Sequence, residues 1–397
     1  MRAAYIVSPV RTPVAKYLGG LADVPAERLA EKVIRAVIER SGVDPHAVED
    51  VVFAQSYANG EAPCIGRWAA LAADLPLEVA GLQIDRRCAG GLTAVATAAA
   101  MVQSGMADVI VAGGAESMSN VEYYTTRMRR GTRAGSATLH DRLERQRERS
   151  QPEERFGPIS GMIETAENVA AEYGIGRAEA DAYAVRSHQR AADAWARGAF
   201  DAEIVPVVVA GRKGETVVDR DEGIRSDASI EAMGALKPLL KDGVVTAGNA
   251  SQQNDAAAAC LIVAEDRLAD LGLTPMARLV GCSAVGCHPG TMGIGPVPAV
   301  EKLFRRTGLG WSNIDLVELN EAFAAQVLAV AKGWEWNEAD KLNVNGGGIS
   351  LGHPIAATGV RLLVSMLHEL QRREARYGLE TMCVGGGQGV AAIFERA

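Results

Sequence analysis

A cysteine opens an alanine-rich run in the stretch Ile84-Asp85-Arg86-Arg87-Cys88-Ala89-Gly90-Gly91-Leu92. Residues 89–104 are small or good helix formers and Gly105 interrupts them, so the segment predicts a helix that begins just after Cys88. The positive end of a helix favours a thiolate, and small neighbours leave the sulfur open to a substrate. A free cysteine is more often part of a buried core, so the stretch alone leaves both interpretations open.

Length and composition are those of a globular protein. The chain has 397 residues, of which 48% are apolar and 23% charged, and this length predicts about two to three domains. The net charge of −8 argues against nucleic acid as a partner. No stretch approaches the ~18 uninterrupted apolar residues of a membrane span. Residues 1–10 contain arginine and proline, and they predict a strand rather than a signal peptide.

The cysteines show neither a CxxC pair nor the regular spacing of a disulfide framework. They lie at six positions: Cys64, Cys88, Cys260, Cys282, Cys287 and Cys383. We therefore expect reduced thiols and a cytoplasmic protein.

Apolar runs between helical segments predict an α/β fold. Residues 51–54 and 109–112 are fully apolar and follow helix-like stretches, which is typical of strands that are buried on both faces. The pattern recurs after Gly272, with strands predicted at 277–281, 314–319 and 381–384 and helices predicted at 299–307 and 359–372.

The two ends of the chain repeat one order of features. Cys88 precedes a helix, a strand and a glycine pair, and His353 precedes a helix, a strand and the glycines that begin at Gly385. This order predicts a duplicated α/β unit, in which the two helix starts face each other across a pseudo-twofold axis. A sulfur on one side and an imidazole on the other suit a nucleophile and its base.

A compositional break marks residues 120–250 as an insertion between the repeats. Residues 127–155 hold nine arginines against five acids. Such a charged run is usually a solvated face, and the alternative is a basic lid for a phosphorylated ligand.

Two further features carry chemistry. His353 lies between glycine and proline, where small neighbours allow a ligand to approach, although such a histidine is more often a loop residue. Cys383 ends an apolar strand, and the glycine-rich turn 385–389 behind it has free backbone N–H groups for an oxyanion. No nucleotide-binding glycine motif and no metal-ligand spacing appears.

Seven motifs together resemble the thiolase family, the acyl-CoA C-acyltransferases. In chain order they are Cys88-Ala89-Gly90-Gly91, Gly113–Asn120, Thr246–Ser251, Asn320–Phe323, Asn345–Gly348, Gly352-His353-Pro354 and Cys383–Gly389. The resemblance covers essentially the whole chain. It implies a five-layered αβαβα fold of two similar halves with an inserted loop domain. The expected boundaries are 1–119 with 251–270, 120–250 for the loop domain that binds coenzyme A, and 271–397.

The resemblance also implies catalytic roles. Cys88 is the nucleophile that becomes acylated, and His353 takes its proton and helps bind the thioester oxygen. Cys383 is the acid and base at the substrate α-carbon. Asn320 positions a water that forms one oxyanion hole with His353, and the N–H groups of Cys88 and Gly385 form the other.

The ligand contacts carried over from the family are Ser251 to the pantetheine arm, Arg225 beside the adenine, and Met162, Met292 and Phe323 in the acyl pocket. Coenzyme A is then a co-substrate whose phosphates meet the arginine-rich segment, with no metal and no other cofactor. The family further implies a homodimer or homotetramer and a place in fatty acid metabolism such as β-oxidation. No nucleic acid and no membrane is expected as a partner.

The implied reaction is reversible thiolytic cleavage of a 3-oxoacyl-CoA, or Claisen condensation of acyl-CoAs, through an acyl-Cys88 intermediate. Gly161 replaces a histidine, Ala356 replaces a glycine and 252–256 depart from the family pattern, which leaves the acyl group open. Two alternatives are a decarboxylating ketoacyl synthase and a catalytically silent acyl-CoA-binding protein. The intact Cys88, His353 and Cys383 speak against the silent protein.

Overall fold

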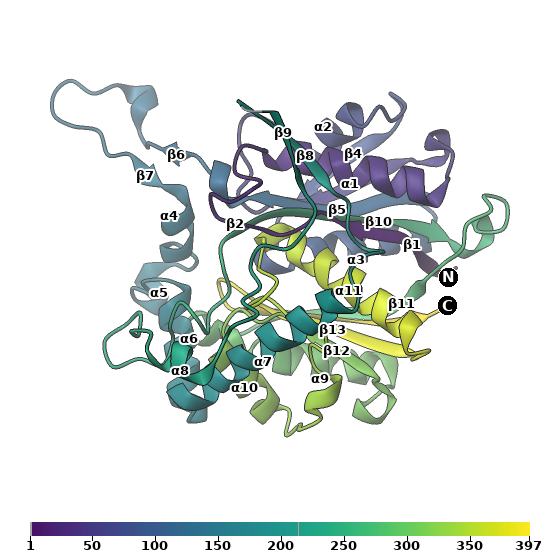
Figure 1. The fold of residues 1–397 in the computed structure, drawn as a ribbon. Helices are drawn as coiled ribbons and strands as arrows, with labels where there is room; N and C mark the ends of the chain where they lie inside the picture. Colours follow the sequence, from purple (N-terminus) through teal and green to yellow (C-terminus); the bar gives the residue numbers. More distant parts are fainter. Residues whose placement is uncertain (1, 213) are drawn as a thin grey trace.

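The computed structural model describes residues 2–212 and 214–397, in which helices and strands alternate at both ends of the chain (Figure 1). The N-terminal half contains β1 (Ala4–Arg11), β2 (Ala15–Lys16), α1 (Ala26–Ser41), β3 (Asp50–Ala54), α2 (Ile65–Ala72), β4 (Ala80–Ile84), α3 (Gly90–Ser104), β5 (Val109–Ser117) and β10 (Asn254–Ala264). The C-terminal half contains β11 (Ala277–Gly286), α9 (Pro296–Thr307), β12 (Leu316–Leu319), α10 (Ala324–Gly333), α11 (Thr358–Arg372), β13 (Tyr377–Val384) and β14 (Gln388–Arg396).

The strands of the two halves join into one sheet. Its order is β12-β13-β14-β11-β1-β10-β5-β3-β4, with β2 paired to β10. The halves meet where Tyr5 and Ile6 of β1 pair antiparallel with Arg278 and Ala277 of β11. On both sides of this junction an antiparallel series ends in parallel pairs, β5-β3-β4 in one half and β13-β12 in the other.

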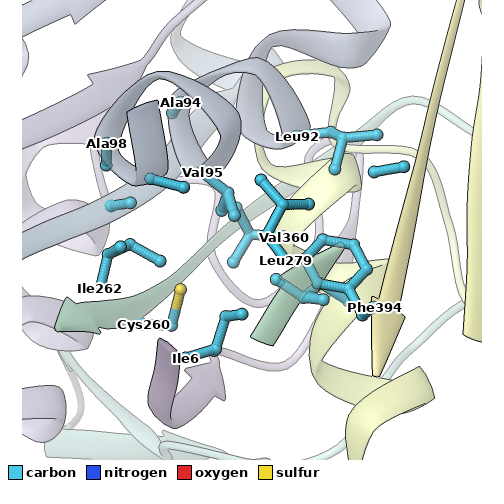
Figure 2. Close-up of a cluster of buried hydrophobic side chains, with 14 of the residues drawn as sticks. Ile6, Leu92, Ala94, Val95, Ala98, Cys260, Ile262, Leu279, Val360 and Phe394 are labelled. Carbon is cyan, nitrogen blue, oxygen red and sulfur yellow. The ribbon is translucent and has the colours of Figure 1, made fainter. Parts of the chain in front are cut away.

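Three hydrophobic clusters define five layers. One cluster packs α1 and α2 on the N-terminal strands, and another packs α9 and α10 on the C-terminal strands. Between the two halves of the sheet lie α3 and α11. Figure 2 shows this central layer, where side chains of α3 meet strands of both halves, among them Ile6, Ile262, Leu279 and Phe394. The predicted five-layered αβαβα fold is confirmed.

The first turns of α3 and α11 touch backbone to backbone. A Cβ atom on Gly359 would lie 2.3 Å from the backbone nitrogen of Leu92, and one on Gly91 would lie 2.8 Å from the carbonyl oxygen of Ala356. Only glycine permits this approach. The helix starts that follow Cys88 and His353 therefore lie against each other, as the repeat predicted.

The insertion carries β6 (Tyr123–Tyr124), β7 (His140–Asp141), α4 (Arg142–Glu148), α5 (Glu153–Phe156), α6 (Met162–Tyr173), α7 (Arg177–Ala196), β8 (Val207–Gly211), β9 (Gly214–Val218) and α8 (Ile230–Gly234). Helix α7 packs on the C-terminal half through Ala180, Tyr183 and Ala184. The hairpin of β6 and β7 extends away from the layers (Figure 1).

The helices formed by residues 2–212 and 214–397 include none that combines the length and apolarity needed to cross a bilayer.

Candidate active site

Cys88 lies in a tight turn before α3. The 3₁₀ turn Arg87–Ala89 joins β4 to the helix, so the helical run begins one residue later than a simple pattern suggests. Arg87 has a φ of 46°, a left-handed conformation that is unusual for a side chain of this size. Its N–H donates to Asp85 Oδ1 at 2.6 Å, and its guanidinium donates to Ser150 Oγ at 2.9 Å. These contacts hold the turn that presents the sulfur.

The Cys88 sulfur sits between two opposing influences. Burial raises the pKa of the thiol, whereas the backbone N–H groups of Gly385 and Cys88 itself lower it, and the net change is upward. The N–H groups at the helix start favour the thiolate, as the sequence predicts, but burial outweighs them. Cys88 is a thiol at neutral pH and needs a base.

His353 is oriented by two polar side chains. Its backbone N–H donates to Asn254 Oδ1 at 2.8 Å, and its ring Nδ1 lies 2.7 Å from Thr358 Oγ1. The Thr358 hydroxyl donates its proton to the carbonyl oxygen of Pro354 at 3.0 Å, so it accepts from Nδ1–H. That tautomer leaves a lone pair on Nε2, as a base requires. Burial and the charges of Arg361 and Arg147 lower the pKa of His353 to about 3, so the imidazole is neutral.

Cys383 lies near the end of β13, and Asn320 comes directly after β12, which pairs parallel with β13. Cys383 is fully buried on β13, and burial and then the nearby Cys88 raise the pKa of its thiol well above the usual range. Asn320 is also fully buried, with Nδ2 3.5 Å from His353 Nδ1 and no hydrogen-bond partner for Oδ1 among the described residues. That separation is long for a hydrogen bond.

A small cavity of about 40 Å³ opens beside Cys88. Its lining comes from both halves and from α4 and α6, namely Ser56, Tyr57, Arg87, Cys88, Gln146, Arg147, Met162, Ile355 and Gly385. A second, open cavity of about 510 Å³ shares Arg87 and Gln146 with it and is otherwise lined by Tyr124, Arg142, Arg145 and Arg149. The arginine-rich segment therefore adjoins the catalytic cysteine.

The predicted ligand contacts are only partly brought together. Met162, Met292 and Phe323 share one apolar cluster with Cys383. The N–H of Ser251 donates to the carbonyl oxygen of Ala322 at 2.9 Å, which places Ser251 next to that cluster. The N–H of Arg225 instead donates to His188 Nδ1 on α7 at 3.1 Å, and Arg225 lines neither cavity.

Glu116 is a structural residue of the site to which the sequence assigned no role. Its carboxylate accepts the N–H groups of Ser56, Tyr57 and Ala356 at 3.1–3.2 Å, and burial raises its pKa to about 7. It thereby joins a loop of the N-terminal half to the segment that follows His353. Glu116 lies within the motif 113–120, so the sequence could have indicated it. Arg147 lines the Cys88 cavity, but nothing in the charged run 127–155 distinguishes it from the other arginines.

Comparisons with known proteins agree with this arrangement. The family model described as "Thiolase, N-terminal domain" matches residues 4–266, and the one described as "Thiolase, C-terminal domain" matches residues 273–396. An acetyl-CoA acetyltransferase of Chromobacterium violaceum is 46% identical over 98% of this chain and 99% of its own length. A beta-ketoadipyl-CoA thiolase of Pseudomonas knackmussii is 43% identical over 100% of this chain and 99% of its own.

A solved structure is similarly close. The crystal structure of the Bacillus anthracis acetyl-CoA acetyltransferase superposes with a TM-score of 0.96 and 41% sequence identity, covering 100% of this chain and 99% of that one. Two family models that together span nearly all of the chain, and full-length relatives well above 30% identity, leave one assignment: this chain belongs to the thiolase family.

Proposed function

We propose that the protein is an acyl-CoA C-acyltransferase that cleaves a 3-oxoacyl-CoA with free coenzyme A, or runs the reverse condensation, through an acyl-Cys88 intermediate. The observation that carries this proposal is the proximity of two thiols, Cys88 and Cys383, together with a neutral, oriented His353 two positions before Ile355, which lines the Cys88 cavity. A nucleophile, a base and a separate carbon acid are the groups that this reaction requires.

The first step forms the covalent bond. The Cys88 proton moves to Nε2 of His353 while the sulfur attacks the 3-oxo carbon. The N–H groups of Cys88 and Gly385 hold the resulting oxyanion, because the N–H donors that act on the sulfur also border the attacked carbonyl. Since His353 starts neutral, it can accept this proton.

The second step breaks the carbon–carbon bond. As the oxyanion collapses, the electron pair passes to the α-carbon, and the enolate oxygen of the leaving thioester is held by protonated His353 and the water on Asn320. Cys383 then donates its proton to the α-carbon and releases acetyl-CoA. The raised pKa of Cys383 suits this role, because the thiol keeps its proton until a carbanion forms.

The third step returns both protons. Free coenzyme A gives its thiol proton to the Cys383 thiolate, and its sulfur attacks the acyl-Cys88 carbonyl. Cys88 leaves with the proton held by His353, so all three side chains regain their starting state. No metal and no further cofactor takes part in these steps; coenzyme A is a co-substrate.

Ser251, Arg225 and the arginine-rich segment are proposed to hold that co-substrate. Ser251 lies beside the apolar cluster of the acyl pocket, where the pantetheine thioester must end. The open cavity lined by Arg142, Arg145 and Arg149 offers charge to the phosphates of coenzyme A.

Thiolysis of a panel of 3-oxoacyl-CoAs tests the function. We expect loss of the 3-oxoacyl thioester absorbance with free coenzyme A, and an acyl adduct on the peptide that contains Cys88. Tight binding of acyl-CoA without turnover would instead favour the silent carrier. Turnover of a malonyl donor with release of carbon dioxide would favour a ketoacyl synthase, to which the second thiol, Cys383, gives no support.

We also propose a cytoplasmic homodimer or homotetramer. All six cysteines are free, as a reducing compartment keeps them. Strand β4 ends the sheet with an open edge on which Leu82 is exposed, and the extended hairpin exposes Tyr123 and Leu139. Open edges and apolar projections favour association with a second copy. Sedimentation equilibrium should give a dimer or tetramer, and a monomer would contradict the proposal.

A further inference from the structure

Helix α4 presents two different faces to the two cavities. Leu143 packs with Tyr57 and Met118, and Arg147 lies one turn further on the same side of the helix. Arg147 lines the cavity that contains Cys88, whereas Arg142, Arg145 and Arg149 line the outer, open one. One guanidinium of the arginine-rich segment is thus separated from the others and directed toward the reacting sulfur.

Arg147 has no anionic partner within residues 2–212 and 214–397. No salt bridge of the described residues includes it, although Arg142 on the same helix pairs with Glu122. Its neighbour is the hydroxyl of Tyr57, where its positive charge opposes the rise in pKa caused by burial.

The buried carboxylate of this region is otherwise engaged. The two carboxylate oxygens of Glu116 accept three backbone N–H groups, those of Ser56, Tyr57 and Ala356. Glu116 is thus bound to the backbone and forms no salt bridge with Arg147 among the described residues. A half-buried guanidinium that faces a small cavity loses hydration, and an anionic ligand restores that loss. An anionic group of a ligand that enters the cavity therefore supplies the partner of the Arg147 guanidinium.

The cavity that Arg147 lines is not the one with Arg142, Arg145 and Arg149, which is proposed to meet the phosphates of coenzyme A. Ser251 and Arg225, the expected contacts of the pantetheine arm and the adenine, do not line the Cys88 cavity either, whereas Met162, which is expected in the acyl pocket, does. Because Cys88 itself lines this cavity, the acyl group on Cys88 is the part of the substrate that extends into it. A cavity of about 40 Å³ fits a short chain only.

We propose that the site selects a short acyl group that ends in a carboxylate, and that Arg147, lining the Cys88 cavity without an acidic partner, binds that carboxylate. The substrate class is then the 3-oxo thioester of a dicarboxylic acid, whose cleavage leaves a succinyl-type group on Cys88. This inference rests on the proposed function and specifies its substrate. Arg147 is a specificity-determining residue, since it contacts the far end of the acyl group and not the reacting carbons.

Two substrates of equal length test the proposal. We would compare kcat/KM for 3-oxohexanedioyl-CoA and 3-oxohexanoyl-CoA, which differ in a terminal carboxylate and a terminal methyl group. The wild type should prefer the carboxylate by about 10- to 100-fold, as for a hydrogen-bonded charge pair. Arg147→Leu should remove the preference while cleavage of 3-oxohexanoyl-CoA continues, and Arg147→Lys should keep part of it. Arg305→Leu, an exposed arginine on α9, is the matched control.

Three results would overturn the inference. The wild type could cleave both substrates equally or prefer the methyl group. Arg147→Leu could lower kcat/KM for both in the same proportion. It could instead raise KM for coenzyme A, which would assign Arg147 to a phosphate.

A failure of the proposed function is recognised separately, because then no 3-oxoacyl-CoA, acetoacetyl-CoA included, is cleaved. In that case equilibrium binding of succinyl-CoA against butanoyl-CoA decides the selectivity. Tighter binding of succinyl-CoA that is lost in Arg147→Leu supports the inference, and equal binding contradicts it.

Discussion

Helices α3 and α11 occupy equivalent places in the two halves, yet they are held in different ways. The 15 residues of α3 are glycine or apolar apart from four polar side chains, and its last turn carries no basic residue. Helix α11 ends in ion pairs from Glu369 to Arg372 and Arg373, and it buries Arg361 completely. Both helices are held by close packing in the central layer, and α11 adds ion pairs at its C-terminal end.

The chemistry divides along the same line. In the proposed reaction, the N-terminal half supplies one reacting side chain, Cys88, and the C-terminal half supplies Asn320, His353 and Cys383. The two halves share the layers that position these side chains. They differ in the segments that connect their strands to their helices. The comparison teaches that covalent chemistry belongs to one repeat and proton transfer to the other, and each step can be disturbed separately.

Removal of the nucleophile should have the largest effect. Cys88→Ser should lower thiolysis by about 10⁴-fold or more, because the acyl-enzyme can no longer form at a comparable rate. Cys64→Ser, which changes an exposed cysteine of the same half, should leave the rate unchanged. Intact mass after incubation with acetyl-CoA reports the acyl adduct, and an adduct that persists in Cys88→Ser would place the nucleophile elsewhere.

Removal of the carbon acid should divide the reaction into its parts. Cys383→Ser should lower carbon–carbon cleavage by roughly 10²- to 10⁴-fold, the range of general acid–base catalysis. Transfer of an acetyl group from acetyl-CoA to Cys88 should fall much less, because Cys383 then protonates only the departing coenzyme A thiolate, which is a far weaker base than a carbanion. Both rates are measurable by rapid quench and mass spectrometry. Equal losses would show that the two repeats do not divide the chemistry.

Loss of the histidine's partner should have a smaller effect. Thr358→Val keeps the shape of the side chain but removes the hydroxyl that lies 2.7 Å from His353 Nδ1. We expect kcat to fall by about tenfold, the value of one hydrogen bond, because Nε2 is no longer fixed as the base. Thermal unfolding serves as the control, since a purely structural role would lower the melting temperature and spare kcat.

The charged end of α11 should affect stability rather than rate. Arg372, Arg373 and Asn345 lower the pKa of Glu369 to about 2, although its burial alone raises the pKa. Because the folded pKa lies below the ordinary value of 4.5, the stabilisation is complete above that pH and is lost as the pH falls toward 2. Glu369→Gln should lower the free energy of unfolding by about 1 kcal/mol at pH 7, and the deficit should narrow toward pH 3. A deficit independent of pH would exclude this ionic origin.

Much of the fold follows from the sequence because its signals are local. The helix predicted over 359–372 is α11 within one residue, since its apolar periodicity and its glycine at the start need no tertiary information. Cys88, His353 and Cys383 stood out because glycine-rich motifs surround each of them. The catalytic roles that the motifs imply for these residues stay a prediction.

What the sequence missed depends on burial and on contacts between distant segments. The raised pKa values of the Cys88 and Cys383 thiols have no signal in the local sequence, because burial in the folded molecule causes them. Asn254 lies 99 positions from His353, and only the folded chain shows their hydrogen bond. Arg147 is one arginine of nine in its segment, and no local pattern distinguishes the one that faces inward.

The close approach of Gly91 to Ala356 and of Gly359 to Leu92 has a consequence for protein engineering. Because main-chain atoms meet there, the spacing between the two helix starts is fixed by van der Waals contact of the main chain and not by the volume of surrounding side chains. Substitutions in the outer layers, such as those that raise heat tolerance or solubility, should therefore leave turnover intact. A methyl group at either glycine would separate the repeats, so these two positions should be excluded from any library of variants.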